Sequence, residues 1–241
     1  MPDAPDYYRF RLDSERNVLG DMAELAVRLK SPVTYDRMGD VVWMEDFSTG
    51  VGRWRTVVGA GGSYVKVDAS FSYWSGFNAK LYAGAAVGNG AAMYKYLSPP
   101  RTNRWGIEVS VAFASAFKWL RIELTHADAV ATYRPQLQVN YVTQKLEYLG
   151  DDSAYHVLGS LSEMASAYGL YHHLKMVVDF ETLEYVKVRQ DGNLYDMAGI
   201  PILPTADAEV PSSIAFIGLY SDNTNAATAR LGSVIVTANE P

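Results

Sequence analysis

The stretch Trp105-Gly-Ile-Glu-Val-Ser-Val-Ala-Phe113 determines the fold class, because apolar residues occupy every second position in it. Successive side chains of an extended chain point to opposite faces, so these apolar residues lie opposite Glu108 and Ser110. The same alternation recurs in Trp119-Leu-Arg-Ile-Glu-Leu-Thr125 and in Gln136-Leu-Gln-Val-Asn140. These segments therefore predict β-strands that bury one face in a core.

On both sides of this stretch, period-two segments cover most of the chain between residues 41 and 237. The other expected strands are 41–47, 53–58, 64–68, 78–82, 93–97, 145–149, 170–180, 184–190, 213–220 and 229–237. Turn clusters such as Gly59-Ala-Gly-Gly62 separate them, no segment of helical periodicity comes between them, and the proline-rich segment 201–211 is expected to be a surface loop. Short alternating strands with turns at this spacing predict an all-β, antiparallel β-sandwich.

The first 40 residues follow a different pattern. Between Glu15 and Leu29, apolar residues recur at spacings of 4, 3 and 4, with charged residues between them. The apolar positions are Val18, Met22, Leu25 and Leu29. This spacing predicts one apolar stripe on a short helix, although Gly20 and the alternation of residues 25, 27 and 29 leave a strand as the alternative. We therefore expect an N-terminal arm, residues 1–40, ahead of one sandwich domain, residues 41–241.

Composition and charge argue against several classes of protein. The 241 residues carry a formal net charge of −6, and no run of Lys and Arg reverses that balance locally, so nucleic acid is not an expected partner. Without cysteine the chain has neither disulfides nor thiolate metal sites. It contains no apolar stretch of membrane-spanning length and begins without the features of a secretory signal, so membrane insertion is not expected. We expect synthesis in the cytoplasm without a signal peptide, and a final location on a virion or outside the cell after release.

Three segments of the sandwich region carry motifs of a known superfamily. Trp43–Trp54 contains Asp-Phe, a glycine turn and a closing tryptophan; Tyr171–Gly192 contains a His-His-Leu-Lys-Met-Val-Val-Asp strand and a return that ends in Asp-Gly. Ile217–Ser221 and Gly232–Thr237 are similar to a closing pair of strands. Together these segments resemble the concanavalin A-like and laminin-G-like jelly-roll superfamily. The resemblance implies a jelly-roll sandwich, and because such folds host lectins, hydrolases and adhesion modules, it does not by itself name a function.

The layout of an arm followed by a sandwich also resembles phage and prophage virion proteins. This second resemblance rests on the stretch from Leu25 to Asp46 and on the Asn-Glu-Pro end of the chain. It implies a capsid decoration or tail-associated protein, with other virion subunits or further copies of the chain as partners.

Catalytic machinery is not expected. Glycoside hydrolysis needs two carboxyl groups about 5–9.5 Å apart, and laminarinase-like members of the superfamily supply them from one strand. The nearest segment, Asp179-Phe-Glu-Thr-Leu-Glu184, falls at an expected hairpin turn, where acidic residues serve the turn. His172 and His173 are adjacent and face opposite sides of a strand, whereas His126 and His156 stand alone, so no metal site is expected.

Calcium is the cofactor alternative that the resemblance raises. Jelly-roll sugar binders hold it with one carboxylate from the first strand, where Asp46 stands, and one before the last strand, where this chain has Arg230-Leu-Gly-Ser233. Because a hard cation needs six to eight oxygen ligands, the missing carboxylate argues against the site. Asp222, with Asn223 and Asn225 beside it, is the compensating candidate. We therefore expect no cofactor, with Asp46 and Asp222 as the calcium candidates.

Two aromatic residues are the candidates for binding a sugar. Tyr73 and Trp74 lie in Phe-Ser-Tyr-Trp-Ser-Gly-Phe77, at an expected loop or strand end, where aromatic faces with polar rims suit a glycan. The leading hypothesis is a non-catalytic display protein of a viral particle that docks through its arm. The alternative is a carbohydrate-binding module, for which a cell-surface glycan is the ligand, and the third is a glycoside hydrolase.

The arm hypothesis predicts the behaviour of a truncated chain. A chain that begins at Asp40 is expected to stay folded and to become monomeric, and Leu25→Asp is expected to have the same effect on assembly. Burying the four apolar side chains of the stripe on a partner is worth roughly 6–10 kcal/mol before the cost of ordering them. Thermal melting and sedimentation measure both properties. A truncated chain that unfolds, beside a monomeric full-length chain, would show that the arm packs on its own sandwich.

Overall fold

The computed structural model describes residues 39–70, 76–86, 88–98, 104–128, 130–161, 170–206, 211–222 and 224–241. The chain divides into two compact units, Met1–Arg37 and Met38–Pro241, and the described residues all belong to the second. The helix expected in the arm, with its assembly residues Val18, Met22, Leu25 and Leu29, lies outside the described residues. Tyr73 and Trp74 lie outside them as well.

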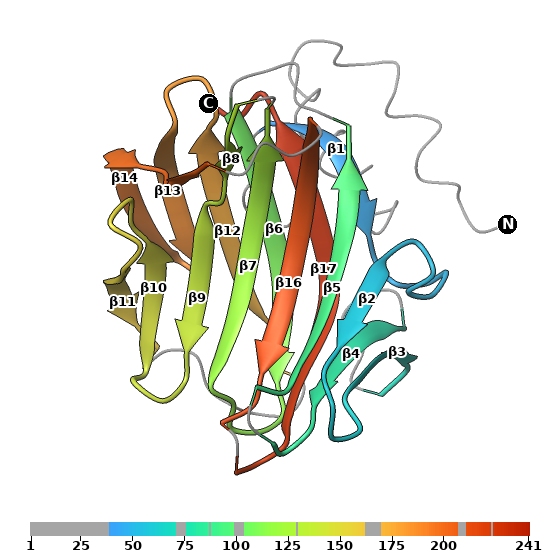
Figure 1. Cartoon of the computed structure of the whole chain (residues 1–241). Coiled ribbons are helices and arrows are strands. Elements are labelled where there is room, and N and C mark those ends of the chain that lie inside the picture. Colours follow the sequence, from blue (N-terminus) through green and yellow to red (C-terminus); the bar gives the residue numbers. More distant parts are fainter. Residues whose placement is uncertain are drawn as a thin grey trace, which may run out of the picture. The chain divides into compact units, whose positions relative to one another are not determined.

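Two antiparallel sheets form a β-sandwich, which confirms the predicted all-β fold (Figure 1). Sheet A has the order β14 (Asn193–Pro201), β13 (Glu184–Gln190), β12 (His172–Asp179), β6 (Arg104–Phe113), β17 (Ala227–Ala238), β4 (Asn78–Ala83) and β3 (Tyr64–Asp68), with β1 (Asp40–Glu45) paired to β17. Sheet B has the order β11 (Tyr155–Ser160), β10 (Lys145–Leu149), β9 (Gln136–Asn140), β7 (Trp119–Ala127), β16 (Ser212–Tyr220), β5 (Gly90–Leu97) and β2 (Arg55–Val58). The short strand β8 (Thr132–Tyr133) pairs with β7 and with β15 (Pro204–Thr205).

Late strands lie between early ones in both sheets. In sheet A, β17 pairs with β6 and β4, and in sheet B, β16 pairs with β7 and β5 (Figure 1). The two centres of the sandwich therefore form only when the end of the chain has joined strands made much earlier. Within the part of the chain that the structure describes, no helix combines the length and the hydropathy needed to cross a membrane.

Every strand expected from the sequence is present, and among the described residues four further strands were missed. The ranges predicted for β3, β9, β10 and β13 coincide with the observed ones. Of the missed strands, β11 and β14 are outermost in their sheets, and most of their residues are at least partly exposed on both faces. They therefore lack the alternation on which the prediction depends. The other two, β8 and β15, have two residues each, and β15 lies in the segment expected to be a loop.

The core fills the space between the sheets with alternate residues of each strand. Along β6, and from Leu120 to Leu124 of β7, the side chains at every second position are at most 2% exposed, apart from Trp105 at 3%, as the alternation of the deciding stretch predicts. The inward-facing residues of these two strands include Ile107, Val109, Val111, Phe113, Leu120, Ile122 and Leu124. Trp54 is buried, and Trp43 is partly buried against the same core.

Tyr185 of β13 crosses this core and joins the two sheets. Its side chain is 1% exposed. Its hydroxyl donates to the carbonyl of Leu149, 2.8 Å away, and accepts from the backbone N–H of Gln136, 3.0 Å away. Burial raises the pKa of Tyr185, so the hydroxyl keeps its proton and remains a donor. A core residue of sheet A thus fixes the start of β9 in sheet B.

Removing this hydroxyl tests the link between the sheets. Tyr185→Phe leaves the Leu149 carbonyl and the Gln136 N–H without their shared partner, so the free energy of unfolding is expected to fall by about 1–3 kcal/mol. Urea denaturation measures it. Tyr64→Phe is the matched control, because the Tyr64 ring stacks on Tyr82 in sheet A and surface changes of this kind cost less than about 0.5 kcal/mol. Equal losses in the two variants would contradict the role assigned to Tyr185.

Candidate functional site

The outer face of sheet B collects polar and aromatic side chains. Leu120, Ile122 and Leu124 of β7 are buried in the core, so the residues between them point to the outer face. These residues are Trp119, Arg121, Glu123 and Thr125. In the neighbouring strand β9, Asn140, Gln138 and Gln136 stand opposite Trp119, Arg121 and Glu123 respectively. Polar pairs therefore line the middle of this sheet.

An open hollow of about 260 Å³ lies on the same face. Its lining combines apolar and polar side chains: Val57, Tyr94, Glu123, Thr125, Arg134, Ile214 and Phe216. The hollow is smaller than the roughly 300–1,000 Å³ pockets that enclose drug-sized ligands. It therefore suits one ring-sized unit and leaves the remainder of a longer ligand on the surface.

Small residues bring the aromatic rings close to the sheet beside this hollow. A Cβ added to Gly218 would lie 2.8 Å from Cζ of Phe216, and one added to Gly90 would lie 3.0 Å from Cδ1 of Tyr220. Real Cβ atoms are not found in contacts as close as 2.8 Å, so the Phe216 ring needs a glycine at position 218. The Phe216 and Tyr220 rings consequently lie over bare backbone and form an aromatic floor.

Glu123 forms the polar wall of the hollow. The hydroxyl of Thr125 donates to Oε1 of Glu123, and the amide of Gln136 donates to Oε2 over 2.7 Å. Burial raises the pKa of Glu123, and this effect exceeds the opposing effects of Thr125, Arg134, Arg121 and Gln136. The carboxyl group therefore holds its proton to a higher pH than an exposed glutamate does.

A second set of hydrogen bonds surrounds Glu147 on β10. Gln138 donates to Oε2 over 2.8 Å, Asn140 donates to both oxygens over 3.2 Å, and the Thr143 hydroxyl donates to Oε1 over 3.3 Å. Gln138 also accepts from Nε of Arg121 over 2.9 Å. Neutral amides and hydroxyls, rather than cations, satisfy this buried carboxylate.

The guanidinium of Arg121 lies among three aromatic rings from three strands. It lies 5.0 Å from the ring centre of Trp119 and 5.4 Å from those of Tyr155 and Tyr220. Cation–π contacts act within about 6 Å of a ring centre. Lys118 approaches the same Trp119 ring to 4.0 Å. Two cations therefore lie at one aromatic cluster, next to the hollow.

The two strand glutamates of this face lie on strands that are not neighbours. Glu123 stands opposite Gln136 and Glu147 opposite Gln138, so they are separated by two strand spacings and by two residues along β9. Strand geometry then puts their Cα atoms roughly 12 Å apart. Hydrogen bonds to different amides hold the two carboxyl groups in place.

The acidic segment considered from the sequence has a structural role. Oδ1 of Asp179 accepts the backbone N–H groups of Glu181 and Thr182, and Oδ2 accepts from Nε of Arg104 over 3.1 Å. Asp179 thus closes the turn between β12 and β13, as expected for an acidic residue at this position.

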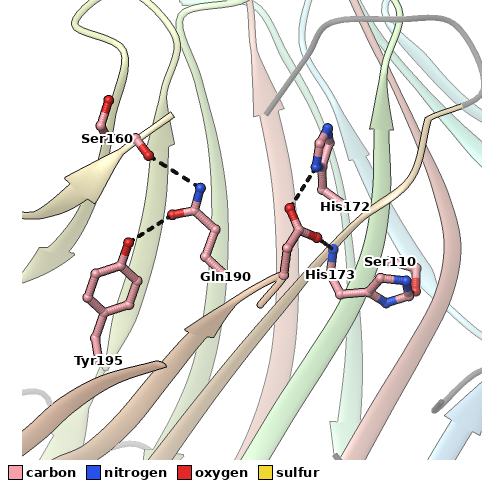
Figure 2. A network of polar contacts seen from close by, with 7 residues as sticks. Ser110, Ser160, His172, His173, Gln190 and Tyr195 are labelled. Atoms are coloured by element: carbon pink, nitrogen blue, oxygen red, sulfur yellow. Dashed lines mark hydrogen bonds and ion pairs between the residues drawn. The ribbon is translucent and has the colours of Figure 1, made fainter. Parts of the chain in front are cut away.

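A cluster of serine, histidine and aspartate on sheet A does not form a catalytic triad (Figure 2). Nδ1 of His173 lies 3.0 Å from Oγ of Ser110, whereas Nδ1 of His172 lies 2.8 Å from Oδ2 of Asp191. Asp191 contacts the backbone N–H of His173, not its ring. A triad needs one imidazole between the serine and the acid, and here two different imidazoles make those contacts. Burial also lowers the pKa of His173.

Gln190, in the same view, closes one edge of the sandwich (Figure 2). Its amide donates to the carbonyl of Ser160 on β11 over 3.3 Å, and its oxygen accepts from the Tyr195 hydroxyl over 3.3 Å. Ser160 belongs to sheet B and Tyr195 to sheet A. These contacts stabilise the sandwich. The outer face of sheet B is therefore the better candidate for a functional site.

The two calcium candidates are not brought together. Asp46 follows β1, whose Glu45 pairs with Val234, whereas Asp222 precedes Ala227, the first residue of β17. Six strand positions from Ser233 to Ala227 span roughly 20 Å. Each carboxylate closes its own turn: Asp46 accepts from Ser48, and Asp222 accepts from Thr224 and Asn225. Among the described residues, no group of three or more His, Cys, Asp or Glu could hold a metal ion.

Comparison with known proteins identifies the fold. No family model matches the chain, and no curated protein sequence matches it. Among solved structures, an endo-β-1,4-glucuronan lyase from the fungus Trichoderma reesei is 8% identical, with a TM-score of 0.58 over 83% of this chain and 96% of that one. The carbohydrate esterase vb_24B_21 of the Shiga toxin-encoding bacteriophage phi24B is 11% identical, with a TM-score of 0.54 over 84% and 100%.

A sialidase shares the fold as well, at 11% identity and a TM-score of 0.55, but this chain spans only 19% of the sialidase. These similarities confirm the concanavalin A-like jelly roll that the sequence motifs implied. At such low identities they show the fold alone.

The raised pKa of Glu123 predicts a pH-dependent stability. A carboxyl group whose folded pKa exceeds its unfolded value stabilises the protein at pH values below the unfolded pKa, and this stabilisation is lost as the pH rises through the folded pKa. Glu123→Gln keeps the neutral form at every pH. Its melting temperature, relative to that of the unsubstituted protein, is therefore expected to be higher at about pH 8 than at about pH 4. A difference that does not change with pH, or that reverses, would contradict the assignment.

Proposed function

We propose that this protein binds a polysaccharide on the outer face of sheet B and does not cleave it. The observation that carries the proposal is the hollow in which the rings of Tyr94 and Phe216 face a polar wall formed by Glu123, Thr125 and Arg134. A sugar ring presents an apolar face of C–H groups and a rim of hydroxyls. An aromatic floor with a few placed polar groups fits both.

The face also extends beyond the hollow, as a polymer requires. Arg121 and Glu123 are two residues apart on β7, which is roughly 7 Å in a strand. One sugar unit in the hollow thus has its neighbour in the chain beside the aromatic cluster around Arg121. Since three solved structures of this fold carry names of carbohydrate-active enzymes, a glycan is also the ligand class that those proteins suggest.

The hydrogen bonds of the acidic residues support binding without cleavage. Glu123 and Glu147 are each held by a separate amide, and Asp179 closes a turn. The proposed role is therefore that of a carbohydrate-binding module.

Display on a viral particle remains a prediction that is compatible with glycan binding. It depends on the arm, residues 1–40, of which the structure describes only the last two. The esterase of bacteriophage phi24B has the same fold, so a phage does encode a jelly roll of this kind. In the combined hypothesis the arm attaches the protein to the particle and sheet B faces the glycan.

Aromatic substitutions test the proposed binding face. Tyr94→Ala and Phe216→Ala are each expected to weaken binding of a β-1,4-linked oligosaccharide at least tenfold, about 1.4 kcal/mol, because each removes an aromatic ring that lines the hollow. Isothermal titration calorimetry measures the affinity. Tyr64→Ala is the matched control, since it removes an aromatic ring from sheet A.

Two outcomes would contradict the proposal. If no glycan on a broad array binds, or if binding survives both substitutions unchanged, sheet B is not the binding face. Release of reducing sugar that Glu123→Gln abolishes would show that the protein is an enzyme.

A further inference from the structure

Arg121 is held in a fixed orientation with one edge uncommitted. The Trp119, Tyr155 and Tyr220 ring centres lie 5.0, 5.4 and 5.4 Å from the guanidinium. Its Nε donates to Gln138 over 2.9 Å. The guanidinium has five N–H donors in a fixed fork, so those of the two terminal nitrogens remain.

Within the described ranges of the chain, Arg121 forms no ion pair. The nearby carboxylates are satisfied by other groups: Glu147 by the amides of Gln138 and Asn140, and Glu123 by Thr125 and Gln136. Gln138 lies between Arg121 and Glu147 and offers its oxygen to the cation and its nitrogen to the anion. The Gln138 amide thus separates Arg121 from Glu147, which would form an ion pair if they were in direct contact.

Two other arginines, one exposed and one buried, form ion pairs, whereas Arg53 and Arg55 lie against the rings of Trp43 and Tyr96. Arg104 lies 3.1 Å from Asp179, and Arg230 lies 3.5 Å from Asp68. Arg121 and the neighbouring Lys118 instead contact the Trp119 ring. The aromatic cluster therefore holds two cations next to the proposed sugar site.

We propose that the polysaccharide bound by this protein is acidic, and that the terminal nitrogens of Arg121 bind the carboxylate of a uronic acid unit. The planar fork of an arginine matches the two oxygens of a carboxylate in a bidentate pair. The aromatic rings exclude water from one side of that pair, which strengthens it. Lys118 supplies a second cation for the field that attracts the polymer. The inference rests on the proposed glycan-binding function and specifies its ligand class.

Two oligosaccharides that differ only in charge test this inference. Cellotetraose and the tetramer of β-1,4-linked glucuronic acid share one linkage and differ in the oxidation of C6. The uronic acid tetramer is expected to bind at least tenfold more tightly at low salt, and the difference is expected to shrink at high salt. Isothermal titration calorimetry with each tetramer gives both values.

Arg121→Gln is expected to abolish this preference, so that the variant binds the two tetramers with equal affinity. Arg121→Lys keeps the charge but loses the fork and the stacking, so it is expected to recover only part of the preference. Lys66→Gln on sheet A makes the same change in net charge away from the site and is the matched control. Melting temperatures of the four proteins establish that each is folded.

The outcomes separate the two proposals. Equal affinity for the two tetramers, or a preference that survives Arg121→Gln, overturns the acidic ligand while leaving glycan binding intact. If neither tetramer binds and no other glycan does, the proposed function itself is wrong. A sulfated cello-oligosaccharide that binds more tightly than the uronic acid tetramer would overturn the assignment of a carboxylate.

Discussion

The alternation of β7 is the constraint on which the candidate site depends. Leu120, Ile122 and Leu124 are buried between the sheets, and shifting the strand by one residue would expose all three and bury the polar set. The core therefore fixes Arg121 and Glu123 on the outer face at a defined spacing. Tyr185 adds a second restraint from the other sheet, because its hydroxyl binds the backbone of Gln136, the residue that binds Glu123. The residues that position the site are therefore buried in the core and do not contact a ligand themselves.

Several charges on sheet A are paired with opposite charges, unlike those around β7 on sheet B. Lys175 lies 2.8 Å from Glu240, with both side chains at most 3% exposed, and Arg104 lies beside Asp179, although Lys66 and Lys80 contact the Tyr64 ring. Breaking a buried pair of this kind is costly, since it leaves a charge without compensation. On sheet B, neutral amides satisfy Glu123 and Glu147, and Arg121 contacts aromatic rings. Paired charges stabilise a fold, whereas charges kept apart remain able to bind a ligand.

The alternation of apolar and polar residues predicts only those strands that have one face in the core and the other in solvent. The central strands, such as β6 and β7, have one face in the core, and their sequences predicted both the fold class and the residues that point inward. The outermost strands β11 and β14 are mostly exposed on both faces and escaped detection. The candidate site was missed because the same alternation that marks Arg121 and Glu123 as outward-facing is the ordinary pattern of a solvated strand. Only the pairing of β7 with β9, which joins residues 119–123 to 136–140, shows that the polar residues form one network.

The identity of residue 138 shows why an amide, and not an acid, suits this face. Gln138 holds Nε of Arg121 at 2.9 Å and donates to Glu147 at 2.8 Å, so it needs both an acceptor and a donor. A glutamate in its place would accept from Arg121 but would have no proton for Glu147, and two buried carboxylates would then repel each other. It would also neutralise Arg121 within the protein. The glutamine satisfies both neighbours without consuming the charge, which is the condition for Arg121 to bind an anion from solution.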